Sequence, residues 1–261
     1  MIKTCLRIGC RHRWILPALC TPVCLLAVLW AVKHNHLFFI VGVSLLVIFF
    51  SCLCGTFASG QLVSFALNRL HKHCDPQPLL EETADQLAYV KNAANRSVLT
   101  INRAAALMET GEHRQALELL EALDVQKPRL APSMRLVYYH NLTTAAIYCN
   151  EAEKAARYYQ DAQTLLPAIR DKEQHATAHR ELADLHAALL LSQGHADEAL
   201  STLTNHPADN LYQRVHHAFL LAQIALLKKD AQLARTQLTF VVKNGGDLHV
   251  SALALTLLER T

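Results

Sequence analysis

Acidic residues are missing from the start of this chain. Residues 1–73 contain seven Lys or Arg and no Asp or Glu, whereas residues 74–261 contain all twenty-two acids. The first part is therefore basic, and the second carries a net negative charge. Nucleic acid attracts a basic face, so the acidic second part argues against a nucleic-acid partner. This division of charge indicates a protein of two parts.

Cysteine, glycine and tryptophan are scarce in the second part. Of eight Cys, seven precede Asp75, which leaves Cys149 alone. A single cysteine cannot form a disulfide within residues 75–261, so nothing there suggests a disulfide-built extracellular fold. Only eight Gly and two Trp occur in the chain, alongside many Ala, Leu, Gln and Glu. This composition predicts an all-α fold.

Motifs of the common enzyme classes are also missing. There is no glycine-rich phosphate loop, no Gly-x-Ser-x-Gly and no His-Glu-x-x-His. The fifteen His are scattered, so we expect no enzymatic activity, no cofactor and no metal. His175 and His179 are one helical turn apart, which leaves open a metal site as well as a solvated helix face.

Two long apolar runs stand out in the first part. Trp14–Val32 and Leu37–Ser59 contain no charged residue, and a helix of about 20 such residues crosses a bilayer. We therefore expect an N-terminal two-helix transmembrane hairpin that contacts the lipid bilayer. The expected divisions are a basic cytoplasmic tail at 1–13 and a hairpin with a juxtamembrane extension at 14–73, with its spans at 14–32 and 37–59.

Basic residues predict the orientation of this hairpin. Four precede the first run, Arg69 and Lys72 follow the second, and the link has only Lys33. The positive-inside rule then gives a multi-pass membrane protein with both termini in the cytoplasm. A signal peptide is the alternative for the first run.

The second apolar run carries small residues at four-residue spacing, at Ser51, Gly55 and Ser59. Such spacing allows helices to pack closely in lipid, within the hairpin or in a homodimer. Small residues are also common in membrane helices generally, so the pattern leaves both explanations open.

A helix-turn-helix pattern occupies residues 97–128. Small residues Ala104 and Ala116 flank Gly111, which suits a turn with positive φ, and Leu120 and Pro128 follow. The pattern resembles the tetratricopeptide repeat, a unit of two helices. One such unit cannot bury its apolar face alone, so the resemblance implies neighbouring units.

Similar units follow along the chain. Their turns fall at Asn150, at Gly194 and at Lys228–Asp230, and the unit starts are 39, 44 and 35 residues apart. These uneven spacings predict long helices or inserted loops. A helix over 79–94 is expected to precede the first unit. We expect a repeat domain over 74–261, a tetratricopeptide-like α-solenoid with units near 97–128, 136–167, 180–211 and 215–246 and a capping helix over 248–259. An irregular α-solenoid or helical bundle is the alternative.

The resemblance implies that the first helix of each unit lines a concave groove for a peptide or partner helix. Asn102 and Asn141 share one unit position, where an amide could hold a peptide backbone or bond within the fold. The basic positions of chaperone-binding members are not basic here, and Glu181 and Asp184 favour a neutral or basic ligand. The candidate partner-binding residues are Ile101, Asn102, His140, Asn141, Tyr148, Asp184, His216 and Gln223, with Val137 and Glu181 among the further groove positions.

These features predict an adaptor that is anchored in the membrane and recruits protein partners at its cytoplasmic face. Anchoring raises local concentration, so a modest groove affinity suffices. The alternative is a membrane-bound sensor or regulator whose His-rich helices respond to metal or pH.

Overall fold

The computed structural model describes residues 42, 46, 60–125, 130–203 and 210–260. It divides into two units, Met1–Phe65 and Ala66–Thr261. Both predicted spans lie almost wholly outside the described residues, as does the small-residue stripe of Ser51, Gly55 and Ser59. Within the described residues, no helix is both long and apolar enough to cross a membrane.

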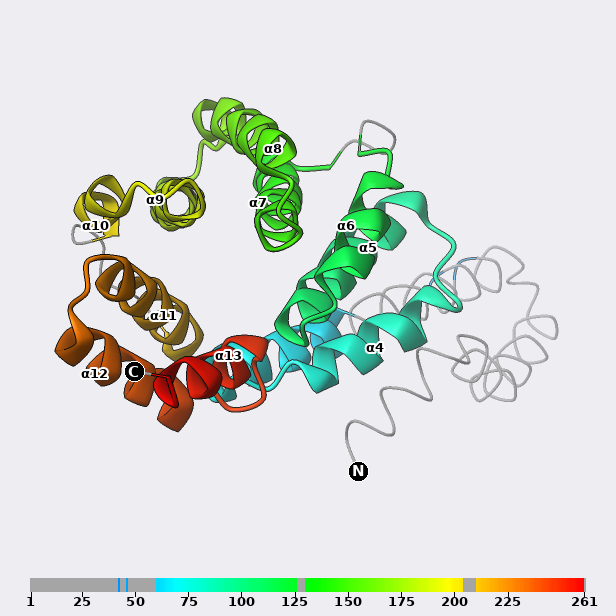
Figure 1. Cartoon of the computed structure of the whole chain (residues 1–261). Helices are drawn as coiled ribbons and strands as arrows, with labels where there is room; N and C mark the ends of the chain where they lie inside the picture. Colours follow the sequence, from blue (N-terminus) through cyan, green and yellow to red (C-terminus); the bar gives the residue numbers. More distant parts are fainter. Residues whose placement is uncertain (1–41, 43–45, 47–59, 126–129, 204–209, 261) are drawn as a thin grey trace, which may run out of the picture. The chain divides into compact units, whose positions relative to one another are not determined.

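In residues 66–261, every regular element among the described residues is a helix, which confirms the predicted all-α fold (Figure 1). Residues 66–73 are helical. The first two helix pairs and the helix before them are α4 (Gln77–Leu87), α5 (Ala93–Glu109), α6 (His113–Glu121), α7 (Pro132–Tyr148) and α8 (Ala152–Leu165). The 3-10 helix η1 (Leu166–Ala168) leads to α9 (Lys172–Ser192), α10 (Ala196–Leu203), α11 (Leu211–Leu227), α12 (Ala231–Asn244) and α13 (His249–Leu258).

The turn within each of the four helix pairs has the same backbone form. Its middle residue has a positive φ, namely Gly111 (90°), Asn150 (60°), Gly194 (84°) and Lys229 (59°). The amide after that residue donates to the carbonyl five residues earlier, which completes the left-handed cap that ends many helices. Three of these turn residues were predicted as such. In the fourth pair, Lys229 adopts the left-handed form within the predicted turn.

Small residues recur at fixed distances from these turns. A fully buried residue lies seven positions before each left-handed residue, namely Ala104, Thr143, Ala187 and Ala222. Another lies five positions after it, namely Ala116, Ala155, Ala199 and Ala234. Short side chains there let the two helices of a pair approach closely. The regular phase supports a repeat-like helical fold.

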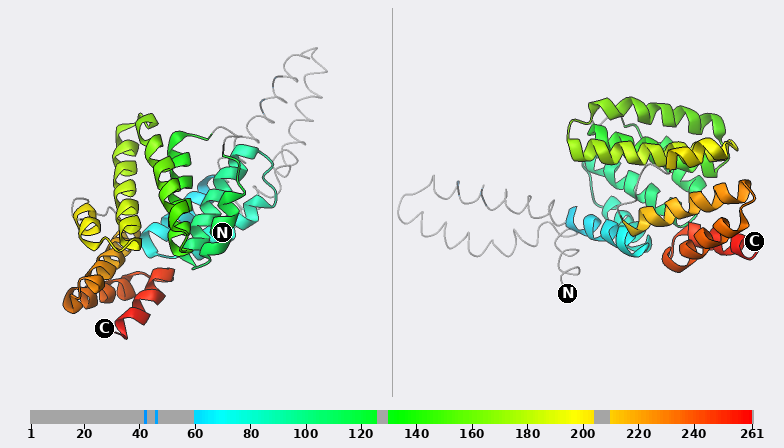
Figure 2. Two further views of the ribbon diagram at one scale, coloured as in Figure 1. Left: turned by 45° about the horizontal axis from the view of Figure 1, so that its top comes forward. Right: turned by 90° about the vertical axis from the view of Figure 1, so that its left-hand side faces the viewer.

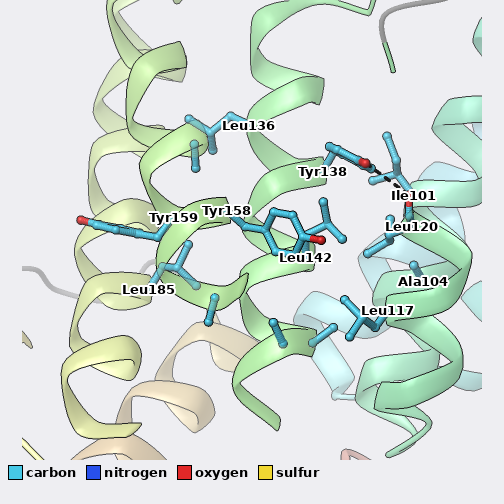
Figure 3. Packing of buried hydrophobic residues seen from close by; sticks show 14 of the residues in the cluster. Ile101, Ala104, Leu117, Leu120, Leu136, Tyr138, Leu142, Tyr158, Tyr159 and Leu185 are labelled. Atoms are coloured by element: carbon cyan, nitrogen blue, oxygen red, sulfur yellow. Dashed lines mark hydrogen bonds between the residues drawn. The ribbon is translucent and has the colours of Figure 1, made fainter. Parts of the chain in front are cut away.

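The largest core cluster joins α5 to α9 (Figure 3). Leu117 and Leu142 are buried in it, and the Tyr138 hydroxyl donates to the Leu120 carbonyl at 3.2 Å. Because a buried hydroxyl without a partner is costly, this bond lets a tyrosine replace an aliphatic residue between α6 and α7.

The first helix of each pair begins before the expected unit start, α5, α7 and α11 by four residues and α9 by eight. The helix expected over 79–94 ends at Leu87. A separate helix, α5, begins at Ala93, because the Asn92 side chain accepts from the Asn95 amide and caps it. Asp171 similarly caps α9, which therefore begins at Lys172, eight residues before the expected unit start. The irregular spacing between the second and third units is thus taken up by a longer helix, one of the two expected outcomes.

Replacing Gly111 by Ala tests how closely α13 approaches the first turn. An added Cβ would lie 2.7 Å from His249 Nδ1, whereas at Gly194 it would meet nothing within 4 Å. Both positions have positive φ, so Gly194→Ala should lower the free energy of unfolding by about 1 kcal/mol through backbone strain alone. We expect Gly111→Ala to lower it by about 2 to 3 kcal/mol, because the His249 ring must also move.

Guanidinium unfolding of the full chain, followed by circular dichroism, measures both variants. Equal losses for the two glycines would show that α13 does not restrict Gly111.

Candidate partner-binding site

A buried carboxylate connects the first helix pair to the last. The Tyr212 hydroxyl donates to Glu109 Oε1 at 2.6 Å, and His216 Nε2 donates to Glu109 Oε2 at 3.1 Å. Glu109 ends α5, whereas both partners lie on α11. Because Glu109 is only 8% exposed, these two bonds satisfy a carboxylate that has little water around it.

The α13 helix makes a second connection to the first pair. The His113 ring stacks on Tyr148 at a centroid distance of 4.1 Å, and His249 meets the His113 ring edge-on at 5.0 Å. Nearby, the Asp247 amide donates to the Cys74 carbonyl at 3.1 Å. The segment expected as a terminal cap therefore also contacts the start of the stack. Figure 2 shows the neighbouring pairs from two further sides, with α12 and α13 packed together.

Charge stabilises the Glu109–His216 pair. Burial raises the pKa of Glu109, but the positive charge and hydrogen bond of His216, with the Tyr212 hydrogen bond, bring it below its usual value. Burial likewise lowers the pKa of His216, and Glu109 more than reverses this. Each side chain therefore favours the charged form of the other.

Two further predicted residues, His140 and Asp184, lie around this pair. Burial lowers the pKa of His140 on α7, while its neighbours Asn141 and Asp184 act in the opposite direction. Asp184 and Glu109 also raise the pKa of His216. The structure thus brings His140, Asp184 and His216 together, in an environment that Glu109 completes. Sequence reasoning had not singled out Glu109.

The remaining predicted groove residues have varied surroundings. Ile101 is fully buried in the core, and its carbonyl accepts from the Asn141 side chain at 3.4 Å. The second of the two uses considered for Asn141, a bond within the fold, is therefore the one that the structure contains. Tyr148 stacks on His113, while Asn102 on α5 and Gln223 on α11 are half-buried.

An open cleft of about 400 Å³ lies between the N-terminal halves of α7 and α9. Two residues of the predicted groove, Val137 and Glu181, line it. We call it the α7–α9 cleft. Its apolar lining is Leu136, Val137, Ile169 and Ala178, and its polar lining is Ser133, Glu173, Gln174, Thr177 and Glu181. Glu173, Gln174, Thr177 and Ala178 were missed because they lie on the part of α9 that precedes the expected unit start. The Asp171 cap was the signal for that earlier start.

Neither a metal centre nor a reactive thiol emerges from the described residues. No group of three or more His, Cys, Asp or Glu among them could hold a metal ion. Burial, with a smaller effect of Glu109, raises the pKa of Cys74 to about 11, so this thiol is protonated at neutral pH.

Comparison with known proteins gives no relative. No protein-family model matches the chain, and no significant match appears among curated proteins or solved structures. The function must therefore be argued from the chain itself.

A double-mutant cycle at Glu109 and His216 should give a coupling energy that depends on pH. The contribution of His216 is complete below pH 6.5 and is lost as pH rises through its raised pKa. That of Glu109 is complete above pH 4.5 and is lost as pH falls through its lowered pKa. We expect a coupling of about 1.5 kcal/mol at about pH 6, falling below about 0.5 kcal/mol at about pH 9.

Unfolding of wild type, Glu109→Gln, His216→Gln and the double variant gives this coupling. His113, His140, Asp184 and Tyr212 are present in all four proteins, so their own titrations largely cancel. A coupling that stays constant between the two pH values would contradict an ionic pair.

Proposed function

We propose that this chain is a membrane-anchored scaffold whose tetratricopeptide-like α-solenoid binds a protein partner at the cytoplasmic face. The observation that carries the proposal is the α7–α9 cleft. It contains Val137 and Glu181, two positions that the repeat resemblance assigns to a partner groove, and it combines apolar and polar lining. Its volume lies within the range of about 300 to 1,000 Å³ that is common for ligand sites.

The repeat phase supports the tetratricopeptide-like part of the proposal. Four helix pairs share a left-handed turn residue, with small residues at the same distances on either side. In repeat proteins of this kind, stacking creates an extended surface for partners.

The membrane part of the proposal depends on the sequence alone. Two uncharged runs, 14–32 and 37–59, have the length of spans, and basic residues flank their outer ends. Anchoring would hold the whole repeat domain near its partners, so the cleft would need only modest affinity.

A regulator that responds to pH is the second candidate function. The Glu109–His216 pair supports it, because this pair joins the first helix pair to the last. The pKa of His216 is raised above its usual value by Glu109. Loss of that charge would weaken the connection.

Photo-crosslinking in cells tests the scaffold. A photoreactive amino acid at Gln174, an exposed residue that lines the cleft, should give a discrete protein adduct. The matched control is Ala176, which is exposed on the same helix but does not line the cleft. Mass spectrometry identifies the adducts. Identical adduct patterns from both sites, or none from Gln174, would contradict partner binding in the cleft.

Reporter fusions test the expected topology. A reporter enzyme that is active only outside the cytoplasm should be inactive when fused after Thr261, because the positive-inside rule keeps both termini in the cytoplasm. The same reporter inserted at residues 33–36 should be active. Activity of the C-terminal fusion would overturn the proposed orientation.

A further inference from the structure

The α7–α9 cleft has a one-sided charge. Glu173 and Glu181 line it, and none of the described residues that line it is Lys, Arg or His. Asp184 follows Glu181 by one helical turn on α9, but it is not among the lining residues and lies 4.0 Å from His217. A negative field of this kind favours a cation and disfavours an acidic segment.

The N-terminus of α9 does not reverse this preference. Helix N-termini attract anions, and α9 begins at the cleft with Lys172. Asp171 already accepts from the Gln174 amide at 2.9 Å, and Glu173 lies in the first turn. The chain's own acids therefore satisfy the positive end of the helix.

Glu181 is a carboxylate in unfavourable surroundings. It is half-buried, and the described residues include no hydrogen-bond or ion-pair partner for it. Burial raises its pKa, and the charge of Asp184 raises it further, while Arg180 has a smaller opposing effect. A partly desolvated carboxylate of this kind gains most when a ligand brings a cation.

The rest of the lining suits an apolar group. Val137 on α7 and Ala178 on α9 face the cleft, and Ile169 closes it before α9 begins. Contact with these side chains removes apolar surface from water, which adds affinity without adding charge. An occupant that fits both halves of the cleft combines a cationic group with an apolar one.

We propose that the α7–α9 cleft binds a peptide segment that presents an arginine or lysine beside an apolar side chain. The cation meets Glu181, and the apolar side chain packs against Val137 and Ile169. This inference rests on the proposed scaffold function and adds the chemical class of the partner.

Selection from a random peptide library displayed on phage tests the inference. The bait is the full-length protein in detergent micelles, and selected peptides should be enriched in Arg or Lys next to Leu, Ile or Phe. A labelled peptide from that pool is then titrated by fluorescence anisotropy. Glu181→Gln should weaken its binding about tenfold or more, because it removes the charge and leaves the shape. The control Glu153→Gln, on exposed α8 surface, should leave binding unchanged.

Two further measurements separate the explanations. Glu181→Gln should leave the thermal midpoint unchanged or raise it, since the carboxylate is desolvated and faces Asp184 in the free protein. Gln174→Arg places a cation at the cleft without changing a buried residue, and it should abolish binding of the basic peptides.

The outcomes are distinct for the two proposals. Selected peptides that lose binding with Gln174→Arg but show no preference for Arg or Lys would overturn this inference and leave the scaffold function standing. Acidic peptides would do the same. A pool whose binding responds to neither cleft variant, or no selected peptide at all, would overturn both.

Discussion

The hydrogen-bonded contact between Glu109 and α11 is the interaction on which the rest of the arrangement depends. Helix pairs in a repeat stack normally contact only their neighbours, so the ends of a stack are free. Here a buried carboxylate at the end of α5 takes its partners, Tyr212 and His216, from the fourth pair. Removing either side would leave a buried charge without its partner, which is strongly unfavourable. The contact therefore joins the first helix pair to the fourth.

The residues of the predicted groove have different surroundings at the two ends of these helices. At the C-terminal ends of α5 and α7, the side chains of Glu109 and Tyr148 contact α11 and His113, and α13 packs nearby. At the N-terminal ends of α7 and α9, the α7–α9 cleft stays open. Residues of one predicted groove thus have two kinds of surroundings. His216 is a structural partner within the unit, while Val137 and Glu181 face a cleft.

Local features of the fold could be predicted because they depend on neighbours in sequence. Gly111, Asn150 and Gly194 could be identified as turn residues, since each lies at fixed distances from small residues. The contact between the first and fourth helix pairs could not be predicted. A polar residue such as His216 looks the same in the sequence whether it meets solvent, a peptide or a distant helix. Of the cleft residues, the resemblance supplied Val137 and Glu181. The others on α9 precede the expected unit start, because the Asp171 cap of that helix was not recognised in the sequence.

Asn102 and Asn141 show why repeat position alone does not assign a role. They occupy equivalent positions, yet Asn141 donates to the Ile101 carbonyl of the preceding pair, and Asn102 on α5 has α4 before it instead of a repeat pair. Equivalent positions meet different neighbours whenever a stack begins, ends or changes spacing. The same reasoning favours Glu181 over the other groove acid. Asp184 lies 4.0 Å from His217, whereas Glu181 faces the cleft, so an added cation gains more there.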